Sequence, residues 1–168
     1  MTYLFFLESH VAVYRLLLDY SSKLNIPLTP TLSAPQALAI IYRQLLQTLK
    51  RNEQGIIENT DTEFLHDFRV AVRRTRAGLS QLKGILPDNI SARYRNYFAW
   101  LGEITTLPRD LDVYVLNFSQ YQNSVSPEMQ PYLQPLQTFL KVKQSSALKK
   151  LARQLKSKKY RDNLAAWE

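Results

Sequence analysis

The chain has 168 residues and a formal net charge of +8, and 45% of its residues are hydrophobic. This length suits one domain with a single core, and this composition excludes wholesale disorder. Because there is no cysteine, disulfides, thiolate metal sites and cysteine nucleophiles are excluded, and we expect a cytoplasmic location. Four glycines are too few for glycine-rich nucleotide loops, and two histidines disfavour a zinc site.

The basic excess is concentrated toward the end of the chain. Residues 1–62 carry five basic and five acidic residues, whereas residues 122–168 carry nine basic and three acidic residues. Such an excess favours polyanionic partners such as nucleic acid, polyphosphate or anionic lipid. The alternative is that these charges serve only solubility.

The N-terminal segment is apolar, and its spacing predicts a helix over residues 3–23. It lacks the basic start and the small-residue cleavage site of a signal peptide. Charged residues interrupt it, so we expect no membrane insertion. A connector with Pro27 and Pro30 follows. We therefore assign residues 1–32 to an apolar helix with its connector and residues 33–168 to a helical bundle.

Ser33 and Gln36 have the spacing of a capping box, which predicts a helix from this point to about Gly55. Further helices are predicted over residues 61–83, 89–104, 109–121 and 136 to the end, with a short break at Ser157. A turn is predicted over residues 105–108. Ser126 and Pro127 suit an N-cap and a first helical position, but Pro131 and Pro135 allow the helix start to slip by several residues. No segment alternates long enough for a strand, so the predicted fold is an all-α antiparallel bundle of about four helices plus an N-terminal helix.

The segment from Phe64 to Arg76, with the residues that follow it to Leu82, has two chemically distinct faces. At about 100° per residue, one stripe about 15 Å long holds only basic side chains and a histidine: His66, Arg69, Arg73 and Arg76. The opposite face predicts the core contact: Phe64, Phe68, Ala71, Val72, Thr75, Leu79 and Leu82. Guanidinium groups bind phosphate oxygens bidentately, and a protonated histidine can also donate to phosphate. The alternative is a solvated face with local ion pairs.

Two other segments carry charge in a pattern. Arg109 is predicted at a helix start beside Asp110 and Asp112, whose carboxylates suit the positive end of the helix dipole. Two aspartates without a third ligand do not define a metal site. In the tail, basic residues fall on one helix face, opposite a leucine face: Lys149, Arg153 and Lys156. This helix could complete a positive channel beside the first stripe, and the alternative is a solvated helix face.

Two sequence segments together resemble the CHAD family, the conserved-histidine α-helical domains. They are "LHDFRVAVRRTRAGL" and, some thirty residues later, "LGEITTLPRDLDVYVL". The tail "LKSKKYRDNL" is similar to a weaker family pattern in which a serine, a basic residue and a tyrosine precede a last helix, and Ser157, Lys159 and Tyr160 occupy those places. The resemblance covers roughly residues 35–168.

This resemblance implies an all-helical fold of two similar halves that binds inorganic polyphosphate. It implies that the domain itself performs no chemistry, and we expect no catalytic residues, no cofactor and no metal. Four residues would line the polyphosphate site: His66, Arg69, Arg73 and Arg76. Arg109 either lines it too or serves as a structural ion-pair partner. Further candidates come from the basic tail: Lys149, Arg153, Lys156 and Lys159.

This chain resembles only the first half of the family pattern. We therefore expect two copies to pair through the N-terminal helix or the open bundle face. A nucleic-acid binder is the main alternative, because ten tyrosines and seven phenylalanines could supply stacking. A helical assembly scaffold is another. An enzyme acting on polyphosphate would need a metal cluster or a nucleophile, and the sequence indicates neither.

Overall fold

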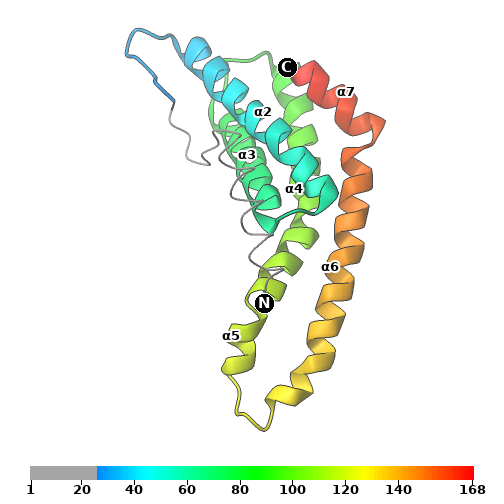
Figure 1. Cartoon of the computed structure of the whole chain (residues 1–168). Coiled ribbons are helices and arrows are strands. Elements are labelled where there is room, and N and C mark those ends of the chain that lie inside the picture. The colour runs from blue at the N-terminus through cyan, green and yellow to red at the C-terminus, as the bar shows by residue number, and fades with distance from the viewer. Residues whose placement is uncertain (1–25) are drawn as a thin grey trace.

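The structure, a computed structural model, describes residues 26–168, which contain helices and no strand. The predicted all-α fold is confirmed. The predicted helix over residues 3–23 lies outside the described residues. The elements, shown in Figure 1, are α2 (Ala34–Glu58), α3 (Thr62–Gln81), α4 (Asp88–Leu116), α5 (Phe118–Asn123), the 3-10 helix η1 (Gln130–Leu133), α6 (Gln134–Leu155) and α7 (Lys158–Trp167).

Four long helices form the bundle. α3 packs against α2 and α4, and α6 packs against the same two helices, so α3 and α6 lie diagonally across the bundle. Figure 1 shows that the hairpin of α4, α5 and α6 extends beyond α2 and α3. No described helix has the length and hydropathy of a membrane span.

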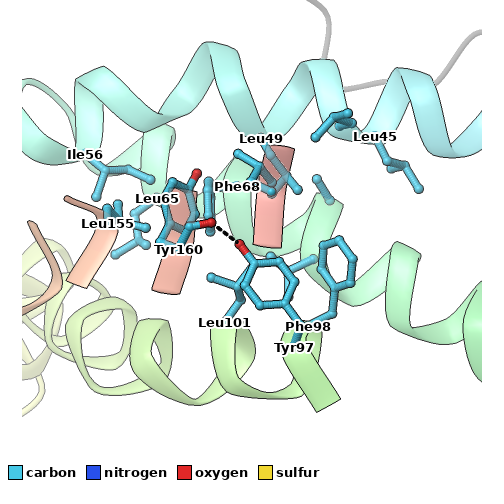
Figure 2. Close-up of a cluster of buried hydrophobic side chains, with 14 of the residues drawn as sticks. Leu45, Leu49, Ile56, Leu65, Phe68, Tyr97, Phe98, Leu101, Leu155 and Tyr160 are labelled. Atoms are coloured by element: carbon cyan, nitrogen blue, oxygen red, sulfur yellow. Dashed lines mark hydrogen bonds between the residues drawn. The ribbon is translucent and has the colours of Figure 1, made fainter. Parts of the chain in front are cut away.

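The core lies where the apolar faces of these helices meet. Figure 2 shows side chains from α2, α3, α4, α6 and α7 packed into one cluster, including Leu49, Phe68, Leu101, Leu155 and Tyr160. All five have at most 1% of their surface exposed. Each buried side chain of this size contributes about 1.5–3 kcal/mol through the hydrophobic effect. The core therefore joins segments from both ends of the described chain.

The start of α2 is as predicted, but its end is not. The backbone N–H of Ser33 donates to Oε1 of Gln36 at 2.9 Å, which is one arm of the predicted capping box. Gly55 does not end the helix, because α2 continues to Glu58 and ends at Asn59, whose φ is +53°. A Cβ on Gly55 would lie only 2.3 Å from the Phe64 ring. Gly55 is therefore required by helix packing and is not a stop signal.

The predicted turn at residues 105–108 is wrong, because α4 runs through it without a break. Pro108 removes one backbone N–H donor from the helix interior. Leu101, Thr105, Pro108 and Asp112 are nevertheless all buried at three- and four-residue spacing. Packing of this face therefore maintains a helix that Pro108 alone would interrupt.

The connection to α6 shows the slip that the prolines allow. No helix begins at Ser126 and Pro127; the chain forms η1 first, and α6 begins at Gln134, close to the predicted start at residue 136. The predicted break at Ser157 is confirmed, because α6 ends at Leu155 and Ser157 is the N-cap of α7. The Ser157 side chain accepts from the backbone N–H of Tyr160 at 3.3 Å.

Candidate functional site

Helix α3 presents a buried face and a basic face, as its periodicity predicts. Asp61 caps its start by accepting from the backbone N–H of Glu63 at 2.8 Å. Six of the seven predicted core residues are buried: Phe64, Phe68, Ala71, Val72, Thr75 and Leu79. The seventh, Leu82, is the C-cap residue and is 44% exposed. The stripe of His66 and three arginines is thereby turned away from the core.

This stripe lines a groove between α3 and α4 with a cavity volume of about 590 Å³. α3 supplies His66, Arg69, Val70, Val72, Arg73 and Arg76. α4 supplies Ala99, Gly102, Glu103, Thr105, Thr106 and Arg109. All four arginines and the histidine that were predicted for the first two segments are thus brought together. Four guanidinium groups face a single carboxylate, so the groove favours anions.

Arg69 is fastened across the groove to α4. Its Nη1 donates to Oγ1 of Thr105 at 2.9 Å, and to the Gly102 carbonyl oxygen and Oγ1 of Thr106 at 3.2 Å each. Partial burial lowers the pKa of Arg69, and the nearby charges of Arg73 and Arg109 lower it further, while Asp110 opposes them. Arginine remains charged at neutral pH, so Arg69 places a fixed cation in the groove.

Arg73 and Arg76 are exposed and make no hydrogen bond or ion pair with another described residue. Arg76 lies directly over Gly102, since a Cβ there would be 3.0 Å from Nη1 of Arg76. Their N–H groups are therefore directed into solvent and are available to a bound anion.

Arg109 lies in the C-terminal part of α4, so its predicted position at a helix start is wrong. Its Nη1 donates to the Thr62 carbonyl oxygen at 3.3 Å, which holds it at the N-terminal end of α3. It forms no ion pair with a described residue. Arg109 also belongs to the groove lining.

Asp110 and Asp112 do not lie at a helix start, because both are within α4. Asp112 is 1% exposed, and its Oδ1 accepts from Nε2 of Gln144 on α6 at 2.8 Å. Its Oδ2 has no hydrogen-bond partner among the described residues. Burial raises the pKa of Asp112, while the Gln144 hydrogen bond and the Arg109 charge oppose the rise. Asp112 is thus a buried link between α4 and α6.

One group of described residues could hold a metal ion. Ligand atoms of Glu63, His66 and Asp67 lie within 4.8 Å of one another. The i, i+3, i+4 spacing of these residues, which places them on one side of a helix, was the signal in the sequence for this group. The group lies at the end of the groove where His66 lines it. Carboxylate and imidazole ligands of this kind suit several divalent ions.

The basic tail does not share the groove. Lys149, Arg153, Lys156 and Lys159 are exposed on α6, its C-cap and α7, and none lines the cavity. Because α6 lies diagonally across the bundle from α3, the predicted channel between the two basic faces does not form in the described part of the chain. Lys159 instead places its Nζ 4.2 Å from the centroid of the Trp100 ring.

Apart from Arg109, the residues on the α4 side of the groove were missed in the sequence. Gly102, Thr105 and Thr106 act through a carbonyl, two hydroxyls and small size, which carry no charge signal. Glu103 is the acidic member of the lining. The sequence signal for these residues was the helical spacing of small and hydroxyl side chains. It was overlooked because a turn was predicted over residues 105–108.

Comparison with known protein families identifies the family of this chain. The family model of the CHAD domain matches residues 40–168, which span the described bundle from within α2 to its end. The chain belongs to the CHAD domain family. No curated protein matches the chain.

The CHAD match includes both helices that line the groove, and it also includes α7. In this CHAD domain the tail pattern has a structural explanation. Ser157 caps α7, and Tyr160 is buried in the core, where its hydroxyl donates to Oε2 of Glu53 at 2.9 Å. Figure 2 shows the Tyr97 hydroxyl donating to the Tyr160 carbonyl oxygen. Lys159 and Tyr160 thus lie within the last helix and do not precede it.

Proposed function

We propose that this protein binds inorganic polyphosphate, without catalysis, in the groove between α3 and α4. The observation that carries the proposal is the convergence of four arginines and His66 on one cavity, opposite a single glutamate. Membership of the CHAD family, which is known for polyphosphate binding, supports the same ligand.

The spacing of the basic groups suits a linear polyanion. His66, Arg69, Arg73 and Arg76 recur about once per helical turn along about 15 Å of α3. Each guanidinium can bind two phosphate oxygens through paired N–H groups. A repeating phosphate chain therefore meets a repeating row of donors, whereas a compact anion would use only part of the row.

Nucleic acid is the second candidate, and the groove gives it less support. None of the residues that line the cavity is Phe, Tyr or Trp. Sequence-tolerant binding of single strands depends on aromatic rings on which bases stack. The buried tyrosines Tyr42, Tyr94, Tyr97 and Tyr160 and the buried phenylalanines Phe64, Phe68, Phe98 and Phe118 are unavailable for stacking.

Calorimetric titration with medium-chain polyphosphate, beside single- and double-stranded DNA at equal phosphate concentration and near-physiological salt, tests the proposal. We expect saturable binding of polyphosphate that is tighter than binding of either DNA. Affinity should fall steeply with salt, because bound cations release counterions. Equal or tighter binding of DNA would contradict the proposal.

A matched pair of variants tests the groove. Arg73→Ala removes a cation from the lining, whereas Arg74→Ala removes the same charge from a neighbouring exposed residue outside it. We expect Arg73→Ala to weaken polyphosphate binding about three- to tenfold and to reduce the salt slope by about one. Arg74→Ala should change both much less. Equal losses would show that net charge, and not the groove, determines affinity.

A further inference from the structure

A second cavity adjoins the groove farther along the same two helices. It has a volume of about 340 Å³ and is lined by Arg76, Ser80, Ala92, Arg95, Asn96 and Ala99. Arg76 and Ala99 also line the first groove. The two cavities therefore meet at these residues and form one path between α3 and α4.

The lining of the second cavity consists of donors and small residues. Arg76 and Arg95 supply guanidinium groups, Asn96 an amide and Ser80 a hydroxyl, and no lining residue is acidic. Arg76 and Arg95 are exposed, and neither forms an ion pair with a described residue. These groups have the chemistry to bind phosphate oxygens, and no lining carboxylate competes for them.

Regular helical spacing aligns the two cavities. On α3, Ser80 follows Arg76 by four residues, which is one turn beyond the stripe that lines the first groove. On α4, Ala92 and Ala99 line the second cavity, and their small side chains leave space between the basic side chains. The distance along α3 from His66 to Ser80 is about 21 Å, compared with about 15 Å to Arg76.

We infer that the second cavity is a continuation subsite for the polyphosphate chain, with Arg95 as its distinguishing cation. This inference rests on the proposed function of the first groove. A short oligophosphate is held by the first groove alone. A long chain continues past Arg76 and reaches Arg95, Asn96 and Ser80. The second subsite acts on a ligand that is already bound, so its contribution is intramolecular and adds to affinity only for long chains.

Two ligands and three variants test this inference by titration calorimetry. The ligands are tripolyphosphate and a long-chain polyphosphate. Arg95→Ala removes the subsite cation. Arg93→Ala is the matched control, because Arg93 is also exposed on α4, lines neither cavity and lies over the Tyr94 ring at 5.3 Å. Arg73→Ala reports on the first groove.

We expect Arg95→Ala to weaken long-chain binding about three- to fivefold and to leave tripolyphosphate binding unchanged. Arg93→Ala should leave the long-chain affinity within about twofold of the wild type. Arg73→Ala should weaken the binding of both ligands.

Other outcomes would overturn the inference. Equal losses of long-chain affinity for Arg95→Ala and Arg93→Ala would show a general charge effect, and an unchanged long-chain affinity for Arg95→Ala would show that the chain does not reach the subsite. In both cases Arg73→Ala would still weaken binding, so the first groove would stand. If the wild-type protein bound neither tripolyphosphate nor long-chain polyphosphate, the proposed function and the subsite would both be overturned.

Discussion

Individual residues divide the groove into a fixed part and an accessible part. Arg69 is fixed by three hydrogen bonds to α4, whereas Arg73 and Arg76 extend over the cavity. Because Arg69 already holds α3 against α4, it has a structural as well as an electrostatic role. Loss of Arg69 would therefore change both stability and affinity, which makes Arg73 the cleaner probe of binding.

Replacement of Gly102 by alanine should have opposite effects on the stability of the fold and on polyphosphate binding. In the interior of α4, Gly102→Ala should stabilise the folded state by up to about 1 kcal/mol through higher helix propensity. The added Cβ would lie 3.0 Å from Nη1 of Arg76 and would displace that flexible side chain. We expect urea denaturation to show a higher free energy of unfolding, and calorimetry to show weaker polyphosphate binding. If Gly102→Ala increased both the free energy of unfolding and the affinity for polyphosphate, the groove would not require glycine at this position.

Asp112 should make stability depend on pH. Its pKa in the folded state is raised above the usual value of 3.8, so the folded state holds the proton more tightly than the unfolded state. The resulting stability is fully present below pH 3.8 and is lost as pH rises through the folded-state pKa. Asp112→Asn removes this titration, so the variant should gain stability relative to the wild type as pH rises toward neutrality.

Urea denaturation at several pH values measures this gain. Asp110→Asn is the control, because Asp110 is an exposed residue of the same helix. A difference between Asp112→Asn and the wild type that stays constant with pH would argue against a raised pKa.

At the scale of elements, sequence periodicity predicted α3 well and α4 poorly. In α3, one 3.6-residue period carries both the apolar face and the arginine stripe, so local pattern and tertiary packing agree. In α4, Pro108 favoured a turn locally, but the burial of Leu101, Thr105 and Pro108 on one face favours a continuous helix. That packing depends on α3 and α6, which no local pattern includes.

Because local sequence patterns do not include contacts between helices, only the α3 half of the site was largely predictable. Charged residues on α3 could be assigned to one face by angle alone. Gly102 and Thr105 gain their roles only when Arg69 reaches them across the interface between α3 and α4. The tail residues show the converse, because Lys149 and Arg153 share a helix face, as predicted, but that face lies away from the groove.

Ser157 lies between α6 and α7, so its substitution tests how α7 is stabilised. Its hydroxyl donates to the Gln154 carbonyl oxygen at 2.6 Å and accepts from the backbone N–H of Tyr160. Ser157→Ala removes the N-cap and should cost about 1 kcal/mol of stability. Ser146→Ala, at an exposed position within α6, should change stability by less than about 0.5 kcal/mol. Equal effects in thermal or urea denaturation would show that the cap does not stabilise α7.

The whole molecule has two surfaces of different character. One is the basic path between α3 and α4, which is suited to a polyanion. The other lies on the hairpin that extends beyond the rest of the bundle (Figure 1). This hairpin exposes large apolar side chains on α4, α5, α6 and their connection: Leu107, Tyr114, Leu116, Tyr121, Met129, Tyr132, Leu136, Phe139 and Val142.

The expectation that two copies of the chain pair can be tested on this hairpin surface. Exposed apolar side chains gathered on one extended element indicate an interaction surface, and a two-fold axis lets one patch cover itself. Phe139 and Val142 are 55% and 63% exposed, so their replacement by glutamate should leave the fold intact. Light scattering at micromolar concentration should give a dimeric mass for the wild type and a monomeric mass for Phe139→Glu combined with Val142→Glu. If Leu16→Glu alone produced the monomer, the N-terminal segment would be the interface instead, and a monomeric wild type would exclude both arrangements.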